Sequence, residues 1–411
     1  MVPLRVLIIA PALDGGDVGE IYSAFQWVEA LSHVAQVTVL ATSRQGKPLA
    51  QQLPLAEVVT WPEPQILYRK FERFNAMAKP WLPVFGHKLA AWVRSAKARG
   101  QMFDIAHQIL PQAMRHATAL RHLGIPYVIG PLGGGLETPA GFLAEVGAGS
   151  GLSRLRNLDG FRMRYEPGLR GSYTKADLIL GVAPYVGTRL AEAGLGHLPF
   201  RPVLERGHGA LPPEHKRQDA VGQLRLLHVG RVVRTKGLRD TVRAMAELRD
   251  LPGVTLTSAG DGEDLAACRA EAQALGVADR ITFLGKIPRD TVEAEYATAD
   301  VFCFPSFREP MGGVFFEAMA HGLPVITAAL GGPDFIIDDT SGIRLPVETP
   351  EQFARDIAGA IRSLAMNPAE RLALGRGART RLMSFGTWEE KAASTVQMYR
   401  DILAARVLRQ P

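Results

Sequence analysis

Two cationic residues, Arg231 and Lys236, lie in a short stretch, residues 230–237, that begins and ends with glycine. The apolar run before it, residues 224–229, predicts a buried strand, so both cations are expected on the loop at its carboxyl end. Open α/β sheets bind ligands at that edge. Arg can grip two phosphate oxygens in a fork while Lys supplies a movable point charge, so the pair suits a diphosphate. Two solvated loop cations would give the same pattern, and the pair alone leaves both interpretations open.

A second stretch, residues 306–318, places two glutamates on either side of a glycine pair. Glu309 is expected on a loop and Glu317 inside the helix that follows, with Gly312 and Gly313 between them. The glycines allow close backbone approach to a ligand, and the first amides of the helix attract an anion such as a diphosphate. Carboxylates instead suit sugar hydroxyls, Glu317 those of a ribose and Glu309 those of a transferred sugar. Without context, an ordinary loop acid and an ordinary helix acid explain them better.

Parallel strands are needed to position these loops, and the chain shows the required pattern twice. Apolar runs alternate with helical stretches first at 4–10, 37–41, 103–106, 126–130 and 178–182, and again at 224–229, 254–258, 281–284, 301–304 and 325–327. Such alternation predicts α/β domains with parallel sheets. Residues 197–222 are rich in proline and glycine, as linkers are. We therefore predict two Rossmann-like domains at 1–200 and 223–385, a linker region at 201–222, and a C-terminal helix at 386–411 that packs back on the first domain.

Length and composition fit this division. The 411 residues, 47% of them hydrophobic, suffice for two cores. The net charge of +6 (47 − 41) suits anionic small molecules or a membrane surface and falls short of a nucleic-acid footprint. Cys268 and Cys303 have no paired spacing, which disfavours a disulfide framework or a zinc site and favours a reducing cytoplasm. The first apolar run is too short for a signal peptide or a membrane span.

Five short motifs carry a resemblance to a known family. They are Gly230-Arg231 with Lys236-Gly237, Ala259-Gly260-Asp261-Gly262, Leu284-Gly285-Lys286, the E-x7-E pair Glu309 and Glu317, and Gly322-Leu323-Pro324-Val325. Each is weak alone, but five in this order are specific, and they cover nearly all of residues 224–340. On these motifs the chain resembles the retaining family 4 glycosyltransferases (glycosyl transferases group 1).

The resemblance implies the GT-B architecture, in which two Rossmann-like domains face each other across a deep cleft. It implies transfer of a hexosyl-type sugar, with retention of configuration, from a nucleoside diphosphate sugar to an acceptor hydroxyl in glycan, polysaccharide or glycolipid biosynthesis. Arg231 and Lys236 would hold the donor diphosphate, and backbone groups near Gly262 and near Lys286 and Ile287 would flank the base. The implied donor-binding residues are Gly15, Gly16, Arg231, Lys236, Gly262, Lys286, Ile287, Glu309, Met311, Gly312, Gly313, Val314 and Glu317.

The first domain matches the family less tightly. Gly15 and Gly16 lie where the family has its glycine loop, although an ordinary tight turn would look the same. The G-x-G-x-x-G fingerprint of dinucleotide binding is absent, which disfavours a dehydrogenase. His107 resembles the family's histidine near the transferred sugar, although a lone histidine is more often structural. Residues 129–135 resemble a mobile loop at the rim of the cleft, with a connecting turn as the alternative. The implied catalytic residues are Glu309, Arg231, Lys236 and His107.

Two departures from the family pattern concern the donor half. Phe335 stands where many relatives have a glutamate, and Met311 replaces a common phenylalanine. Neither changes the cations or the E-x7-E pair. No D-x-D motif is present to hold a divalent metal, so we expect no metal cofactor and expect Arg231, Lys236 and the helix N-terminus to balance the leaving charge.

The acceptor is the least defined partner, with an acceptor glycan or a lipid-linked glycan as the expectation and no nucleic acid. Basic and aromatic residues fit a peripheral position on an anionic membrane, and equally fit a solvated helical face over a core. Two other functions stay open: a nucleotide-sugar 2-epimerase of the same architecture, and a catalytically silent scaffold on a membrane surface. The residues concerned are 68–74, 79–82, Lys88, Trp92, Arg94, Lys97 and Arg99, with Arg154, Arg156, Arg162, Arg164 and Arg170 as a second cluster.

Overall fold

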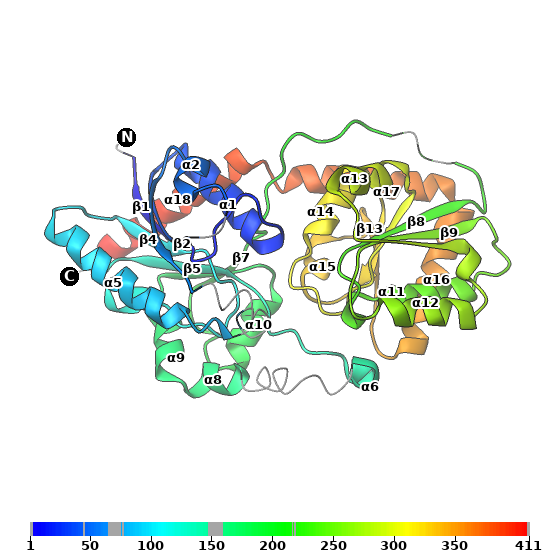
Figure 1. The fold of residues 1–411 in the computed structure, drawn as a ribbon, viewed down its shortest axis with the longest axis horizontal. Helices are drawn as coiled ribbons and strands as arrows, with labels where there is room; N and C mark the ends of the chain where they lie inside the picture. Colours follow the sequence, from blue (N-terminus) through cyan, green and yellow to red (C-terminus); the bar gives the residue numbers. More distant parts are fainter. Residues whose placement is uncertain are drawn as a thin grey trace. The chain divides into compact units, whose positions relative to one another are not determined.

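The computed structural model describes residues 3–43, 46–64, 75, 78–146, 159–215, 217 and 219–408. The chain forms two compact units, each built on a parallel sheet (Figure 1). Unit 1 comprises Met1–Gly135, Ser150–Gly207 and Gly386–Pro411, and unit 2 comprises Leu136–Gly149 and His208–Phe385.

Unit 1 has a seven-stranded sheet in the order β3-β2-β1-β4-β5-β6-β7, with all neighbouring strands parallel. Its strands are β1 (Arg5–Ile9), β2 (Gln36–Ser43), β3 (Glu57–Pro62), β4 (Ile105–Gln108), β5 (Tyr127–Leu132), β6 (Leu178–Gly181) and β7 (Phe200–Pro202). Its helices are α1 (Gly19–Ser32), α2 (Leu49–Gln52), α5 (Leu82–Ala98), η1 (Ala119–His122), α8 (Asp159–Tyr165), α9 (Pro167–Thr174), α10 (Tyr185–Glu192) and α18 (Trp388–Val407). The central strands are apolar on both faces because helices cover both sides of a parallel sheet.

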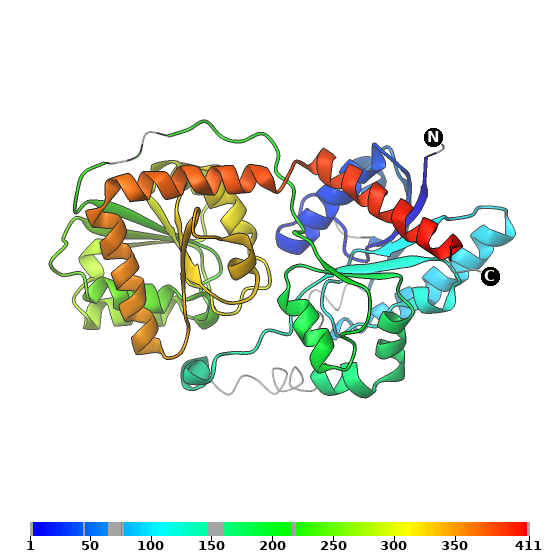
Figure 2. The same ribbon diagram turned by 180° about the vertical axis from the view of Figure 1, so that it is seen from behind.

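The C-terminal helix α18 is part of unit 1 (Figure 2). It begins at a capping box, in which Thr387 and Glu390 satisfy each other's backbone N–H groups. It packs against α1, where the indole Nε1 of Trp27 donates to Thr395 Oγ1 at 3.0 Å. Tyr399 is fully buried in the same core. The twenty-residue helix α18 thus contributes to the hydrophobic core of the first unit.

Unit 2 has a six-stranded parallel sheet in the order β10-β9-β8-β11-β12-β13. Its strands are β8 (Leu224–Val229), β9 (Val254–Ala259), β10 (Ile281–Gly285), β11 (Val301–Cys303), β12 (Val325–Ala328) and β13 (Gly342–Leu345). Its helices are η2 (Ala140–Phe142), α6 (Leu143–Val146), η4 (Arg234–Lys236), α11 (Leu238–Ala246), α12 (Leu265–Ala274), η5 (Ala278–Arg280), α13 (Arg289–Thr298), α14 (Gly313–Ala320), α15 (Gly331–Ile336), α16 (Pro350–Met366) and α17 (Pro368–Ser384).

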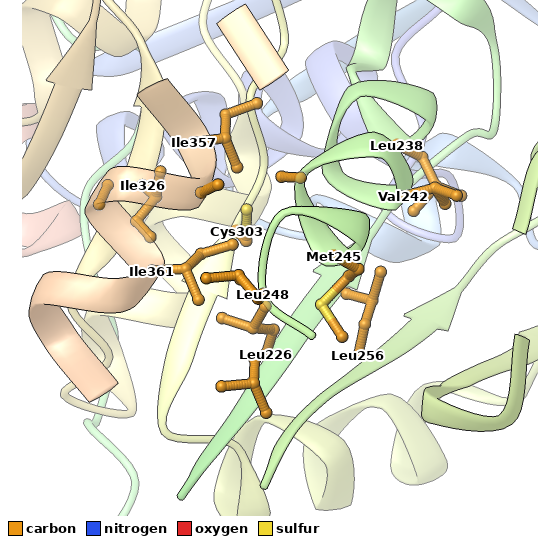
Figure 3. Close-up of a cluster of buried hydrophobic side chains, with 14 of the residues drawn as sticks. Leu226, Leu238, Val242, Met245, Leu248, Leu256, Cys303, Ile326, Ile357 and Ile361 are labelled. Atoms are coloured by element: carbon orange, nitrogen blue, oxygen red, sulfur yellow. The ribbon is translucent and has the colours of Figure 1, made fainter. Parts of the chain in front are cut away.

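Helices cover both faces of this second sheet. Figure 1 shows α11, α12 and α16 on one side and α13, α14 and α17 on the other. In Figure 3, side chains from α11 and α16 point onto strands β8, β9, β11 and β12. The strand order reverses direction at β8, which has β9 on one side and β11 on the other. This is the switch point at which doubly wound sheets bind ligands.

The structure corrects the sequence-based description in three places. Residues 136–149 lie within the predicted first domain, 1–200, but belong to unit 2 because Phe142 is buried in its core. The predicted linker 201–222 is divided between the units after Gly207, and β7 reaches into it. Residues 129–135 are predicted as a rim loop or a connecting turn, whereas residues 129–132 form the buried end of β5 and Gly133 forms an isolated parallel bridge with Ala113.

Candidate functional site

The carboxyl edge of the unit 2 sheet gathers most of the residues that the sequence singles out. The loops after β8, β9, β10 and β11 all leave the sheet at this edge, because the strands are parallel. They carry, in turn, the Arg231–Lys236 stretch, Gly262, Lys286 with Ile287, and Glu309.

The loop after β8 is held by its own turn and by the loop after β11. Gly237 has φ +78°, and a Cβ there would collide with the carbonyl oxygen of Pro305. The carbonyl oxygen of Thr235 accepts hydrogen bonds from Ser306 Oγ and Phe307 N–H, both at 3.2 Å. The two loops are thus bonded through the backbone, which fixes the side chains that they carry.

Lys236 and Glu309 form an ion pair between these two loops. Their side chains are 11% and 12% exposed, so water screens the pair only weakly. The Lys236 ammonium also lies 5.9 Å from the centre of the Phe304 ring. The structure therefore brings together the predicted phosphate-binding lysine and the predicted sugar-binding acid, in contact with each other. Arg231 is exposed, and its guanidinium has no ion-pair partner among the described residues.

Glu309 is also fixed through its backbone. Its carbonyl oxygen accepts a hydrogen bond from Gly332 N–H at 2.9 Å, at the start of α15. Met311, two residues on, is buried, and a Cβ on Gly332 would lie 2.5 Å from its Cα. Gly331 and Gly332 thus support the Glu309 loop. Phe335, which stands where many relatives have a glutamate, is half-buried, and its carbonyl oxygen accepts a hydrogen bond from Arg381 Nη2 at 3.3 Å.

Helix α14 starts directly after this loop. Gly312 is its N-cap with φ +92°, and Gly313 and Val314 form its half-buried first turn. Backbone amides in the first turn of a helix can bind an anion, and this turn lies at the sheet edge. Phe315 is fully buried and anchors the helix.

Glu317 lies on the second turn of α14 and is held by a residue that sequence reasoning missed. The hydroxyl of Tyr296, on α13, donates to Glu317 Oε2 at 3.3 Å. Tyr296 is fully buried and stacks on His321, with ring centres 5.5 Å apart. Nothing in the sequence around Tyr296 distinguishes it from an ordinary core aromatic residue.

The remaining donor-half positions differ in exposure. Gly262 packs so closely on the loop after β8 that a Cβ would collide with the carbonyl oxygen of Val232. Its N–H bonds to Asp261 Oδ1 at 2.7 Å. Lys286 is exposed and Ile287 half-buried at the end of β10. Gly262, Lys286 and Ile287 thus follow strands β9 and β10, which lie on the side of β8 away from β11.

In unit 1, Gly15 and Gly16 form the turn between β1 and α1. Gly15 N–H donates to Gln52 Oε1 at 2.8 Å, and Gly16 N–H donates to Asp14 Oδ1 at 2.9 Å. A Cβ on Gly15 would lie 2.7 Å from the Phe25 ring, so the turn is closely packed.

His107 lies on β4 and is 1% exposed. Its Nε2 donates to the carbonyl oxygen of Gly130 at 2.6 Å, and its Nδ1 accepts from the Tyr399 hydroxyl at 2.6 Å. Burial lowers the pKa of His107 to about 4, so the ring is neutral near pH 7. Both ring nitrogens have protein partners, and a sugar would have to displace one of them.

The basic and aromatic residues are only partly described. Residues 68–74, Arg154 and Arg156 lie outside the described residues. On α8, Phe161 and Tyr165 are 63% and 57% exposed, and the Arg164 guanidinium lies 5.6 Å from the centre of the Tyr165 ring. Within the described ranges, no helix is long and apolar enough to cross a bilayer. In the same part of the chain, no three His, Cys, Asp or Glu residues are grouped as metal ligands would be.

Comparison with known proteins identifies one family and several relatives that match part of the chain. Residues 223–363 match the family described as Glycosyl transferases group 1. A glycogen synthase of Mycobacterium tuberculosis is 34% identical over 204 residues, which are 48% of this chain and 47% of that protein. A lipopolysaccharide core biosynthesis glycosyltransferase, LpsE of Rhizobium meliloti, is 36% identical over 149 residues, 36% of this chain and 42% of that protein. The chain thus matches less than half the length of these relatives.

Solved structures match along nearly the whole chain. The sucrose-phosphate synthase of Thermosynechococcus elongatus aligns with a TM-score of 0.65 and 21% identity, over 98% of this chain and 100% of that one. Anabaena Alr3699/HepE in complex with UDP aligns with a TM-score of 0.64 and 16% identity, over 97% of this chain and 100% of that one. At these identities the likeness shows the fold, which confirms the predicted architecture. The chain has the GT-B fold, and its residues 223–363 match the Glycosyl transferases group 1 family.

Proposed function

We propose that the protein transfers a hexosyl-type sugar from a nucleoside diphosphate sugar to an acceptor hydroxyl, with retention of anomeric configuration. One observation carries the proposal: Lys236 and Glu309 are paired at the switch point of the unit 2 sheet, beside the first turn of α14. A cation, an acid and a helix N-terminus at this edge match what a diphosphate joined to a sugar requires. The glycosyltransferase relatives and the UDP bound to the HepE neighbour support it.

In this proposal, a donor replaces the contact between Lys236 and Glu309 with contacts to itself. The Lys236 ammonium and the exposed Arg231 guanidinium bind the diphosphate, while the Glu309 carboxylate accepts hydrogen bonds from sugar hydroxyls. Glu317, held by Tyr296, accepts those of the ribose. These charges are in place before the bond to the diphosphate breaks, so they stabilise the leaving group with little reorganisation.

The transfer step is a substitution at the anomeric carbon. The bond from this carbon to the diphosphate oxygen breaks with its electron pair, and the acceptor oxygen forms the new bond on the same face. The acceptor proton passes to the departing diphosphate. Arg231, Lys236 and the α14 amides balance the charge, and we propose that no divalent metal is needed. A catalytic role for His107 stays a prediction, because both its ring nitrogens are bonded within unit 1.

We propose a glycan or lipid-linked glycan as the acceptor, met in the cytoplasm or at the inner face of the cytoplasmic membrane. The exposed Phe161 and Tyr165, with Arg162 and Arg164 on the same helix, support contact with an anionic bilayer. Flotation with vesicles of increasing phosphatidylglycerol content tests this contact. Equal binding by wild type and Phe161→Ser/Tyr165→Ser, or no dependence on anionic lipid, would contradict it.

A donor screen tests the proposed activity. UDP-, GDP-, ADP- and dTDP-sugars are added to wild type and to Glu317→Ala, with and without EDTA, and thermal stability and sugar release are measured. Exposed Glu351 on α16 gives the matched control, Glu351→Ala. We expect one nucleotide family to stabilise wild type and the control, but not Glu317→Ala, regardless of EDTA.

Other outcomes would favour the other functions. Conversion of the donor sugar without an acceptor would indicate a 2-epimerase, and no stabilisation by any donor would indicate a silent scaffold. Once an acceptor is found, NMR of the product reports its anomeric configuration, and inversion would contradict the retaining mechanism.

A further inference from the structure

Residues 136–146 are attached to unit 1 through β5 but pack within unit 2. They run through η2 and α6 and are here named the docked segment. Gly141 packs so closely that a Cβ would collide with the carbonyl oxygen of Glu348. The segment is therefore wedged into unit 2 and not simply laid over it.

Phe142 is the apolar anchor of the docked segment. It is fully buried, with its ring centre 4.4 Å from that of Phe307 and 6.0 Å from that of Phe353. Phe307 lies two residues before Glu309 on the same loop. Phe142 thus packs directly on the loop that presents the proposed sugar-binding acid.

Glu145 is the polar anchor, and its partner is on the other donor loop. Its carboxylate pairs with Arg234 at 2.6 Å and with Arg243 at 2.9 Å. Burial opposes ionisation of Glu145, but the two guanidiniums outweigh it and hold the pKa of this carboxyl below its ordinary value. Arg234 lies two residues before Lys236, in η4.

Arg234 joins the two anchors. Its guanidinium lies 5.2 Å from the centre of the Phe142 ring and 5.4 Å from that of Phe307. It also pairs with buried Asp240 at 2.6 Å. Removing either anchor would therefore leave part of this buried guanidinium without its contacts, and the loop carrying Lys236 would lose a fixed point.

Two further contacts join the docked segment to residues close to Glu309. Arg308 Nη1, on the residue before Glu309, donates to Thr138 Oγ1 at 3.2 Å. Leu136 packs at Gly331, where a Cβ would lie 2.8 Å from Leu136 Cδ1 and 2.6 Å from the carbonyl oxygen of Glu309. The docked segment therefore contacts Arg308, the residue before Glu309, and Gly331, whose neighbour Gly332 donates to the Glu309 carbonyl oxygen.

We propose that Phe142 and Glu145 are positioning residues of the donor site, which hold the loops of Lys236 and Glu309 in the geometry that a donor diphosphate requires. They act through Arg234 and Phe307 and do not touch the donor themselves. The inference rests on the proposed function for its ligand, but the ordering of the two loops can be measured without a ligand. Its physical basis is preorganisation: a loop fixed in advance loses less conformational freedom on binding.

The test uses the full chain with Phe142→Ala, Phe142→Leu, Glu145→Gln and, as the matched control, Leu143→Ala. Leu143 is on the same segment but 58% exposed. Circular dichroism checks folding, and hydrogen exchange reports the order of residues 231–237 and 305–313. Calorimetry compares UDP, GDP and ADP with UMP, GMP and AMP, because only the diphosphate carries the second phosphate that Lys236 would bind.

We expect faster exchange in both loops for Glu145→Gln and Phe142→Ala, with Phe142→Leu close to wild type and Leu143→Ala unchanged. We also expect the preference for diphosphate over monophosphate to fall on the order of tenfold in Glu145→Gln, as for loss of a charged hydrogen bond. Unchanged exchange in folded Glu145→Gln and Phe142→Ala, or equal loss of affinity for both nucleotides, would overturn the inference. If exchange rises but wild type binds no nucleotide, the positioning stands and the proposed function fails.

Discussion

The Lys236 ammonium and the Glu309 carboxylate are joined across the two loops that follow neighbouring strands β8 and β11. Among the described residues, Lys236 forms its ion pair with Glu309, and neither side chain has a second ion-pair partner. We expect the pair to affect both the stability of the fold and the binding of a donor. Comparing a single with a double substitution separates these two effects.

Lys236→Met should leave the Glu309 carboxylate unpaired at a site that is only about one-tenth exposed. We expect a loss of about 3 kcal/mol in the free energy of unfolding, at the low end for breaking a buried pair because some water reaches this one. Lys236→Met/Glu309→Gln should recover part of this loss, since it removes the unpaired charge. Both variants should lose about 10²–10³ in kcat as charge stabilisation is lost. Denaturant unfolding and donor kinetics measure the two effects, and a fully active double variant would contradict the assignment.

Tyr296→Phe removes the hydroxyl that bonds to Glu317 and, at 3.5 Å, to the Val314 carbonyl oxygen, while keeping the ring stacked on His321. A bond to a charged acceptor at 3.3 Å is long, so we expect a loss of about 1.4 kcal/mol, a factor of ten in donor KM, with kcat within about twofold. Phe substitution at Tyr173, whose buried hydroxyl bonds to the Met114 carbonyl in unit 1, is the matched control. An equal change of KM in both variants would indicate a general loss of stability.

His107 should make stability depend on acid pH. Burial lowers its pKa from the ordinary value of 6.5 to about 4 in the folded state, so the unfolded chain binds the proton more readily between these values. Its neutral form therefore contributes stability that is fully present above about pH 6.5 and is lost as the pH falls towards 4, by about 3 kcal/mol. The free energy of unfolding of His107→Gln, measured from pH 4 to 7, should fall less steeply than that of wild type. A kcat/KM inflection near pH 6–7 that vanishes in this variant would instead show that His107 titrates in the reaction.

How much the sequence reveals differs between central and edge elements. The central strands β8 and β11 are predicted because burial on both faces makes them continuous apolar runs. The strands β3, β7 and β13 are missed, and all three are at sheet edges, while the fourth edge strand, β10, is predicted from its apolar run at 281–284. None of the six residues of β3 is buried, and the strand contains Glu57 and Pro62, so its composition resembles that of a loop. Edge strands are recognised mainly by their neighbours, which a single sequence does not display.

For the candidate site, the sequence predicts several of the residues but not the contacts between them. The E-x7-E spacing and the two cations place Glu309, Glu317, Arg231 and Lys236 on the correct loops and helix. The pairing of Lys236 with Glu309, the support of Glu317 by Tyr296 and the docking of Phe142 are not predictable from spacing. Each depends on residues far apart in the chain, which only the packed core brings into contact.

The backbone turn at Gly237 offers the sharpest test of how rigid the donor loop must be. Gly237 and Gly276 both have positive φ, +78° and +65°, but a Cβ on Gly276 would meet nothing within 4 Å, whereas one on Gly237 would collide with Pro305. Gly276→Ala should therefore cost only the backbone strain, about 1 kcal/mol, and leave donor binding unchanged. Gly237→Ala adds a collision with the loop that carries Glu309, so we expect at least about 3 kcal/mol in unfolding and a loss of donor affinity greater than tenfold. Denaturant titration and nucleotide calorimetry on both variants measure these effects. Equal behaviour of the two would mean that the contact between Gly237 and Pro305 can relax, and that donor binding does not depend on a rigid loop.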